Sequence, residues 1–242
     1  SYTVNYLEKD TNKVLHEAKV QGGMTFEEVV NSADEVITIE GYNYDSVDKE
    51  KLTIGTGKNE INIYYTKRND LSYTVNYLEK DTNKVLHEAK TVDKQTFGDT
   101  VTETAIDVQG YNKVDPTSQN LTVTADPAEN VITFYYTKKT DLSYTVNYLE
   151  KDTNKVLSPQ KVKDGMTFGT VITSSDEVIK IDGYNYDSVD KDTLEIGTGD
   201  NVINIYYTKR TDLSYKVNYL EKDTDKVLSP QKVKDGMTFG TV

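Results

Sequence analysis

The sequence predicts an α+β array of small domains, each built from two β-hairpins with one helix between them (ββαββ). Three observations predict this class. The chain repeats itself at a fixed period, two segments of each repeat show the alternation of β-hairpins, and the segment between them has the apolar spacing of a helix. The period is 71 residues, and a period of this length indicates separate small domains, each with its own core.

The repeat boundaries follow from one recurring tetrapeptide. Ser-Tyr-Thr-Val begins at Ser1, Ser72 and Ser143, a spacing of 71 residues, and a near copy begins at Ser214. Placing the boundaries before the helix would also give three full units, but the short charged junctions favour boundaries at the tetrapeptide. We therefore define repeat 1 as 1–71, repeat 2 as 72–142, repeat 3 as 143–213 and a truncated repeat 4 as 214–242, which holds one hairpin and the start of a helix.

The first hairpin of repeat 1 spans residues 1–20. Tyr2, Val4 and Tyr6 alternate with their neighbours, as in a strand that is buried on one face. A polar stretch rich in turn-forming Asp and Asn follows, and residues 14–20 resume an extended pattern.

A helix is expected next. Thr25 with Glu28 three residues later has the pattern of a capping box, which marks helix N-termini. Phe26, Val29, Val30 and Ala33 then have the spacing of one helical face. This pattern predicts a short helix that places Phe26 and Val30 in the core.

The second hairpin completes the domain. One strand is expected within 44–54 and another at 61–65, with a glycine-containing turn between them. A helix between two hairpins packs across a four-stranded sheet whose first and last strands lie parallel in the centre, with a right-handed crossover. This is the β-grasp (ubiquitin-like) arrangement, with Ile61, Ile63 and Tyr65 in the core. Because the junctions are short, we expect a monomeric, elongated rod.

Composition excludes several functional classes. The chain has 40 acidic and 28 basic residues and a net charge of −12, so nucleic acid and anionic membranes are poor partners. It has no cysteine and two histidines, and no apolar run approaches the roughly 18 residues of a membrane span. We expect no metal site, no cofactor and no membrane insertion in this segment. No catalytic constellation stands out, and a repeat this small cannot easily enclose a deep cleft, so we expect no enzymatic activity.

Tyrosine is in marked excess, with 19 copies against five phenylalanines. Its flat ring and hydroxyl suit sugar stacking and protein contacts when exposed, although tyrosines on the first and last strands are better explained as core residues. The best ligand-binding candidates follow a glycine in each full repeat, except that Lys113 replaces the second tyrosine of repeat 2. These candidates are Tyr42, Tyr44, Tyr111, Tyr184 and Tyr186.

Four motifs occur in order within the repeats: the segment 4–10, the segment 165–171 before the helix, Gly41-Tyr42 and the closing segment 63–67. On these motifs the repeat resembles the MucBP (mucin-binding protein) repeat of Gram-positive bacterial surface adhesins. The resemblance covers every repeat and lies in four motifs, with Asn12 where many family members have glycine. It implies a β-grasp-like fold, export and adhesion to host glycoproteins.

The leading hypothesis is therefore a repeat segment of a cell-surface adhesin that binds mucin or other host glycoprotein glycans through many weak contacts. Such a protein is extracellular and anchored to the cell wall by signals outside this segment. The alternative is a passive structural stalk that projects another domain from the wall. The sequence does not identify the ligand or the binding face.

Overall fold

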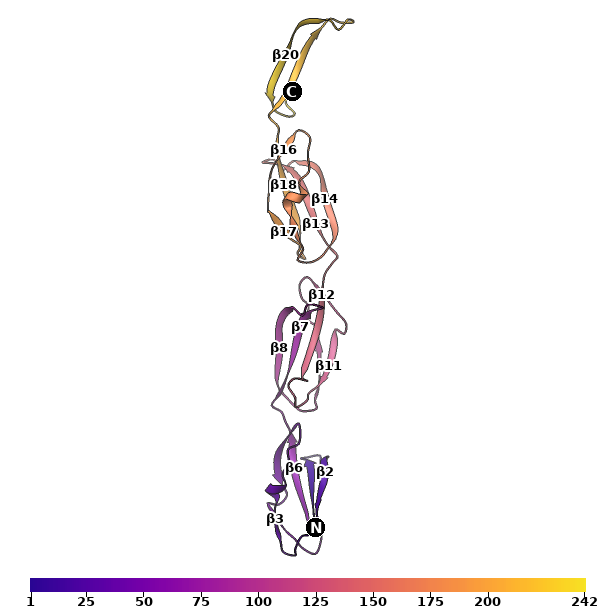
Figure 1. Ribbon diagram of the computed structural model, residues 1–242, viewed down its shortest axis with the longest axis vertical. Coiled ribbons are helices and arrows are strands. Elements are labelled where there is room, and N and C mark those ends of the chain that lie inside the picture. Colours follow the sequence, from indigo (N-terminus) through magenta and orange to yellow (C-terminus); the bar gives the residue numbers. More distant parts are fainter. The chain divides into compact units, whose positions relative to one another are not determined.

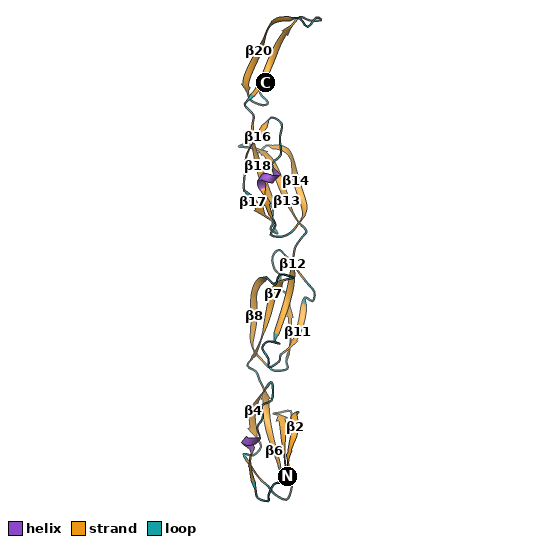
Figure 2. Ribbon diagram, in the orientation of Figure 1, coloured by secondary structure: helices purple, strands orange, loops and turns teal.

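The computed structural model describes residues 1–242, and it consists almost entirely of β-strands and loops (Figures 1 and 2). Contacts divide the chain into two compact units. The first comprises Ser1–Asp107 and Lys113–Thr137, and the second comprises Val108–Asn112 and Lys138–Val242. No helix in the structure is long and apolar enough to cross a membrane.

Repeat 1 forms a four-stranded sheet in the order β2-β1-β6-β4 and a small two-stranded sheet of β3 and β5. Strands β1 and β6 lie parallel in the centre of the larger sheet, with Val4 opposite Ile61 and Tyr6 opposite Ile63. The bounds are β1 Tyr2–Glu8, β2 Val14–Gln21, β3 Val29–Asn31, the 3-10 helix η1 Ser32–Glu35, β4 Tyr42–Val47, β5 Lys51–Thr53 and β6 Glu60–Lys67.

Repeat 2 has the same main sheet, in the order β10-β12-β7-β8, and a two-stranded sheet of β9 and β11. It has no 3-10 helix. The bounds are β7 Leu71–Glu79, β8 Val85–Gln95, β9 Thr100–Thr104, β10 Tyr111–Lys113, β11 Ser118–Thr122 and β12 Val131–Lys138.

Repeat 3 returns to the pattern of repeat 1, with sheets β14-β13-β18-β16 and β15-β17, and repeat 4 contains the single hairpin β19-β20. The bounds are β13 Leu142–Glu150, β14 Val156–Met166, β15 Val171–Thr173, the 3-10 helix η2 Ser174–Glu177, β16 Tyr184–Val189, β17 Thr193–Glu195, β18 Val202–Lys209, β19 Leu213–Leu220 and β20 Val227–Met237.

The central parallel pair is as predicted, and so are the core residues on its two strands. Along β1 the side chains alternate between buried and half-buried, and Tyr2, Val4 and Tyr6 face the core. Ile61 and Ile63 are fully buried on β6. A strand that is buried on one face requires this period-two alternation, which is why the sequence predicts these residues correctly.

The predicted helix, and with it the α+β, β-grasp assignment, is wrong. Thr25 and Glu28 do form the expected contact, since the Glu28 carboxylate accepts from the Thr25 backbone N–H at 2.7 Å, but this contact closes only a turn. Glu27 has a positive φ of 63°, which a helix does not tolerate. Val29 and Val30 then enter β3, in keeping with the strand preference of β-branched residues.

Because the predicted helix does not form, Phe26 does not lie in the core. Phe26 is 62% exposed, contrary to the prediction, whereas Val30 packs against the core from β3 as a half-buried residue. The only helical structure in the repeat is the single 3-10 turn η1, visible as a short coil in Figure 2.

A hydrogen-bonded triad anchors η1 to the main sheet. The Tyr2 hydroxyl donates to Glu35 Oε1 at 2.6 Å, and Lys19 Nζ contacts Glu35 Oε2 at 2.6 Å. Burial, followed by the hydrogen bond to Glu35, raises the pKa of Tyr2 to about 12. Burial alone would raise the pKa of Glu35, but the bonds from Lys19 and Tyr2 leave it lowered.

The same triad occurs in the other full repeats. Tyr144, Glu177 and Lys161 form it in repeat 3, again with the glutamate on a 3-10 turn. In repeat 2 the glutamate is Glu103, which lies on β9. The carboxylate is therefore retained as an anchor even where the backbone that carries it changes from a 3-10 turn to a strand.

Candidate binding groove beside the Gly-Tyr turns

In each full repeat a glycine with positive φ turns the chain into the strand that holds the candidate tyrosines. We call the glycine and the tyrosine after it the Gly-Tyr turn: Gly41-Tyr42, Gly110-Tyr111 and Gly183-Tyr184. Gly41 has φ 78°, a conformation that side chains of L-residues rarely adopt. The strand that follows it, β4, pairs antiparallel with β6, and Tyr44 lies opposite Tyr65.

The tyrosine of each Gly-Tyr turn is half-buried and already contacts other side chains of the chain. Tyr42 donates a hydrogen bond to Glu8 Oε1 at 3.2 Å, and its ring meets Phe97 edge to face at a centroid distance of 5.6 Å. Tyr184 makes the matching contacts to Glu150, at 3.4 Å, and to Phe239. Burial and the Glu8 carboxylate raise the pKa of Tyr42.

The tyrosine two residues after the Gly-Tyr turn is more exposed. Tyr44 is 49% exposed and Tyr186 is 48% exposed. Each leans edge to face on a buried tyrosine of the last strand, Tyr65 and Tyr207, at 6.3 and 6.4 Å. A ring that is supported from one side and accessible from the other can stack on an apolar ligand face such as that of a sugar ring.

In repeat 3 both tyrosines line one open groove. The groove has a volume of about 520 Å³ and is formed by residues 178–186 with Tyr207, Arg210 and Asp212. Arg210 donates from Nε and Nη2 to the two carboxylate oxygens of Asp212, both at 2.9 Å. The groove therefore combines a supported aromatic ring with charged hydrogen-bonding groups, an arrangement that can hold a polar ligand with an apolar face.

Repeat 1 has a related groove of about 430 Å³, formed by residues 38–43 with Arg68, Asp70 and Ala125. Arg68 and Asp70 pair as in repeat 3, at 3.0 and 3.2 Å. Tyr42 lines this groove, but Tyr44 is not among its lining residues.

Repeat 2 has no tyrosine at the position of Tyr44 and Tyr186. Tyr111 packs against Phe168 at 5.7 Å, and Lys113 takes the place of the second tyrosine. Lys113 is paired with Asp107 at 2.8 Å. The five candidates thus fall into two kinds: Tyr42, Tyr111 and Tyr184 pack against phenylalanines, whereas Tyr44 and Tyr186 expose one side of the ring.

Sequence reasoning missed the phenylalanines that cover the Gly-Tyr turns. Phe97, Phe168 and Phe239 each sit in a Thr-Phe pair, aligned with Phe26, which was predicted to be in the core. The available signal was that Thr-Phe recurs in all four repeats while its helical context does not: Gly98 and Gly169 stand where repeat 1 has Glu27. Two of the three full repeats therefore carry glycine at the point where a helix would start.

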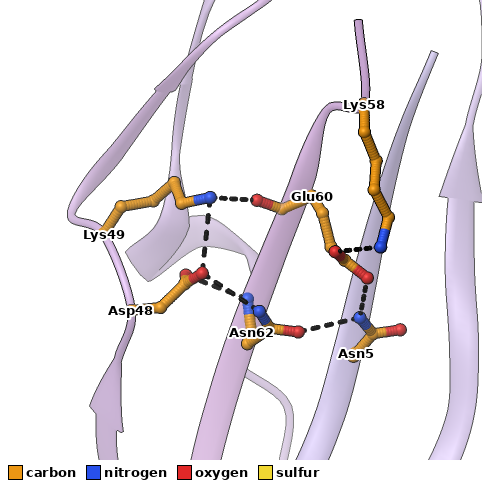
Figure 3. Close-up of polar contacts among 6 residues, drawn as sticks. All are labelled: Asn5, Asp48, Lys49, Lys58, Glu60 and Asn62. Atoms are coloured by element: carbon orange, nitrogen blue, oxygen red, sulfur yellow. Dashed lines mark hydrogen bonds and ion pairs between the residues drawn. The ribbon is translucent and has the colours of Figure 1, made fainter.

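Repeat 1 also carries a network of polar side chains joined by hydrogen bonds and ion pairs (Figure 3). Asp48 accepts from the backbone and side-chain nitrogens of Asn62, both at 3.0 Å, and Asn5 donates to both Asn62 and Glu60. Repeat 3 retains the asparagine pair but has Val202 in place of Glu60. The shared contacts join the central strands to the loop after β4, which is a structural role. The network comprises Asn5, Asp48, Lys49, Lys58, Glu60 and Asn62.

No protein-family model and no curated protein matches the chain. A structure described as the crystal structure of Mub-RV is 18% identical, with a TM-score of 0.21 over 57% of this chain and 98% of its own. Streptococcal High Identity Repeats in Tandem (SHIRT) domains 3-4 from a cell surface protein are 13% identical, with a TM-score of 0.22 and the same two coverages. At these TM-scores neither likeness carries an argument about function.

Proposed function

We propose that this chain is a repeat segment of a bacterial cell-surface adhesin and that it binds mucin or other host glycoprotein glycans multivalently. The observation that carries the proposal is the groove beside Gly183-Tyr184, where Tyr186 and the Arg210–Asp212 pair lie together. Repeat 1 presents Tyr44 with the same exposure, next to a related groove. Recurrence on one chain suits a ligand that is itself repeated, as glycans on mucin are.

Each site is expected to be weak. The grooves are open and bury little of a ligand, so affinity arises from several contacts that are held at high effective concentration on one chain. We propose an extracellular location with anchoring to the cell wall by signals outside this segment, as the resemblance to MucBP repeats implies. We propose no catalytic activity, cofactor or metal for it.

The test is binding of the full chain to immobilised mucin, intact and deglycosylated. We expect saturable binding to intact mucin, loss on deglycosylation, and loss in the double variant Tyr44→Ala, Tyr186→Ala. Both rings are half-exposed, so the fold should tolerate their removal. Tyr215→Ala is the matched control, since Tyr215 is 46% exposed and lines neither groove.

The second candidate function is the passive stalk, and one observation favours it: a phenylalanine covers every Gly-Tyr turn, so each repeat is in contact with the next. Binding no greater than that of an equally acidic control protein would favour the stalk over the adhesin. Equal binding of the wild type and the double variant would show that the two tyrosines do not form the site.

A further inference from the structure

Three phenylalanines make the same contact in this chain, each with the Gly-Tyr turn of the repeat before it. The rings of Phe97, Phe168 and Phe239 lie on Gly41, Gly110 and Gly183 and meet the adjacent tyrosines edge to face at 5.6 to 5.7 Å. The first contact belongs to the first compact unit and the other two to the second. A geometry that recurs three times with the same residue types is a built interface.

Backbone hydrogen bonds fix each contact on both sides. The Arg68 N–H donates to the Gly41 carbonyl at 2.9 Å, and the Phe97 N–H donates to the Arg68 carbonyl at 2.8 Å. The same pair of bonds joins Gly110, Lys139 and Phe168, at 2.9 and 2.9 Å. The turn, the junction and the phenylalanine therefore form one hydrogen-bonded series.

Glycine is required at the centre of the contact. Gly110 has φ 82°, and a Cβ built there would lie 2.5 Å from the ring of Phe168. Gly41 and Gly183 are crowded by their phenylalanines in the same way. Only a residue without a side chain lets the ring approach so closely.

Phe26 is the fourth copy of this phenylalanine and has no such partner. It is 62% exposed, whereas Phe97 and Phe168 are half-buried. Its backbone N–H makes none of the hydrogen bonds that its equivalents make to a junction carbonyl. An exposed aromatic residue beside a turn, with identical residues engaged elsewhere in the chain, is an unoccupied half of the same interface.

We propose that Phe26 and the turn that carries it form a docking surface, and that its partner is the Gly-Tyr turn of another repeat of this sequence placed ahead of it. All three Gly-Tyr turns of this chain already carry a phenylalanine. The partner turn must therefore come from an additional repeat, and two copies of this chain have no free turn to offer each other. This inference does not depend on which ligand the repeats bind.

The test extends the chain. A copy of residues 143–213 is joined ahead of Ser1, so that the added repeat presents a Gly183-Tyr184 turn to Phe26. Amide hydrogen exchange is then measured at Phe26, with Phe97 and Phe168 as internal references. We expect the Phe26 amide of the original chain to exchange at least about tenfold faster than the two references, and to slow to their range in the extended chain.

A matched control uses the extended chain with Gly183→Ala in the added copy, which should return the Phe26 amide to fast exchange. Should that variant fail to fold, Phe26→Ala replaces it. This substitution should leave the melting temperature of the original chain unchanged and lower that of the extended chain, while Phe97→Ala lowers both.

Two results would overturn the proposal. One is a Phe26 amide whose exchange does not change on extension, or is already as slow as that of Phe97 in the original chain. The other is self-association of the original chain that Phe26→Ala abolishes, since Phe26 would then bind a surface other than a Gly-Tyr turn.

Discussion

Gly41, Gly110 and Gly183 each combine two requirements that only glycine meets. Each has a φ near 80°, and each lies beneath an aromatic ring with no room for a Cβ. Gly57, in the turn before β6, has neither constraint: nothing lies within 4 Å of the Cβ position. Gly57 therefore serves as a control for the three glycines that cannot be substituted.

We predict that Gly41→Ala destabilises the chain and Gly57→Ala does not. The left-handed backbone alone costs about 1–2 kcal/mol for an L-residue. Displacement of the Phe97 ring adds to this cost. Thermal melting of both variants measures the difference, and a decrease of several degrees is expected for Gly41→Ala alone. Equal melting temperatures would show that the ring does not occupy the turn in solution.

The triads give the chain a defined response to acid. The pKa of Glu35 in the folded chain lies below its ordinary value of 4.5, so its interactions with Tyr2 and Lys19 stabilise the fold above that pH. The stabilisation is lost as pH falls through the lowered pKa. Glu177 behaves in the same way in repeat 3.

We therefore predict that Glu35→Gln lowers stability at pH 7 and weakens the dependence of stability on pH below about 4.5. Melting temperatures between pH 3 and pH 7 measure both effects. Asp34→Asn, at the exposed neighbouring position, is the control and should keep the wild-type profile. An unchanged pH profile in Glu35→Gln would contradict a stabilising role for the triad.

At the scale of elements, the segment 25–35 shows what the sequence could and could not predict. The strands were predictable because burial on one face imposes alternation, and Tyr2, Val4 and Tyr6 show it plainly. The helix was mispredicted because a capping-box pair also closes an isolated turn, and two valines after it satisfy helical spacing and a strand equally. The valines form a strand and not a helix because β3 pairs with β5, which lies about 20 residues later in the sequence.

The candidate site was predicted in part for a similar reason. A glycine followed by tyrosines predicts a turn with accessible aromatic residues, but it predicts no groove beside that turn. It does not show that Tyr42, Tyr111 and Tyr184 are covered, because the covering phenylalanines lie 55 to 57 residues later in the sequence. Only tertiary structure brings such distant residues together.

One substitution distinguishes the turn from the predicted helix by the sign of its effect. Glu27 has positive φ, and repeats 2 and 3 place Gly98 and Gly169 at the equivalent position, also with positive φ. We predict that Glu27→Gly stabilises repeat 1 by about 1 kcal/mol by relieving backbone strain. In a helix the same change would destabilise it by a similar amount. The denaturant midpoint measures the sign, and Gly169→Glu should shift it in the opposite direction.

At the scale of the whole molecule, repeat 4 differs from the full repeats in what its hairpin packs against. Tyr215 and Tyr219 are 46% and 43% exposed, whereas the equivalent Tyr144 and Tyr148 of repeat 3 are 2% and 3% exposed. The difference reflects the central parallel strand: β18 lies beside β13, whereas β19 pairs only with β20.

We predict that amides of β19 exchange orders of magnitude faster than those of β13, because an isolated hairpin is only marginally stable. Hydrogen exchange followed by NMR or mass spectrometry compares the two strands within one sample. Equal protection would show that residues 214–242 bury a core of their own. That result would contradict the assignment of these residues to a truncated repeat.

The central functional claim is that the chain binds its ligand through several weak sites at once. If Tyr44 and Tyr186 belong to separate weak sites on one chain, either single substitution leaves one site and removes the avidity that two provide. Linked weak sites exceed either affinity by roughly 10²–10⁴. Loss of one site should therefore accelerate dissociation sharply, while the double variant should not bind.

The measurement is the dissociation rate of the full chain and of Tyr44→Ala, Tyr186→Ala and the double variant from surfaces of intact mucin. We predict slow dissociation of the wild type, dissociation of each single variant that is faster by about tenfold or more, and no measurable binding of the double variant. Unchanged dissociation in all three variants would contradict glycan binding through these tyrosines, and no binding of the wild type would support the passive stalk.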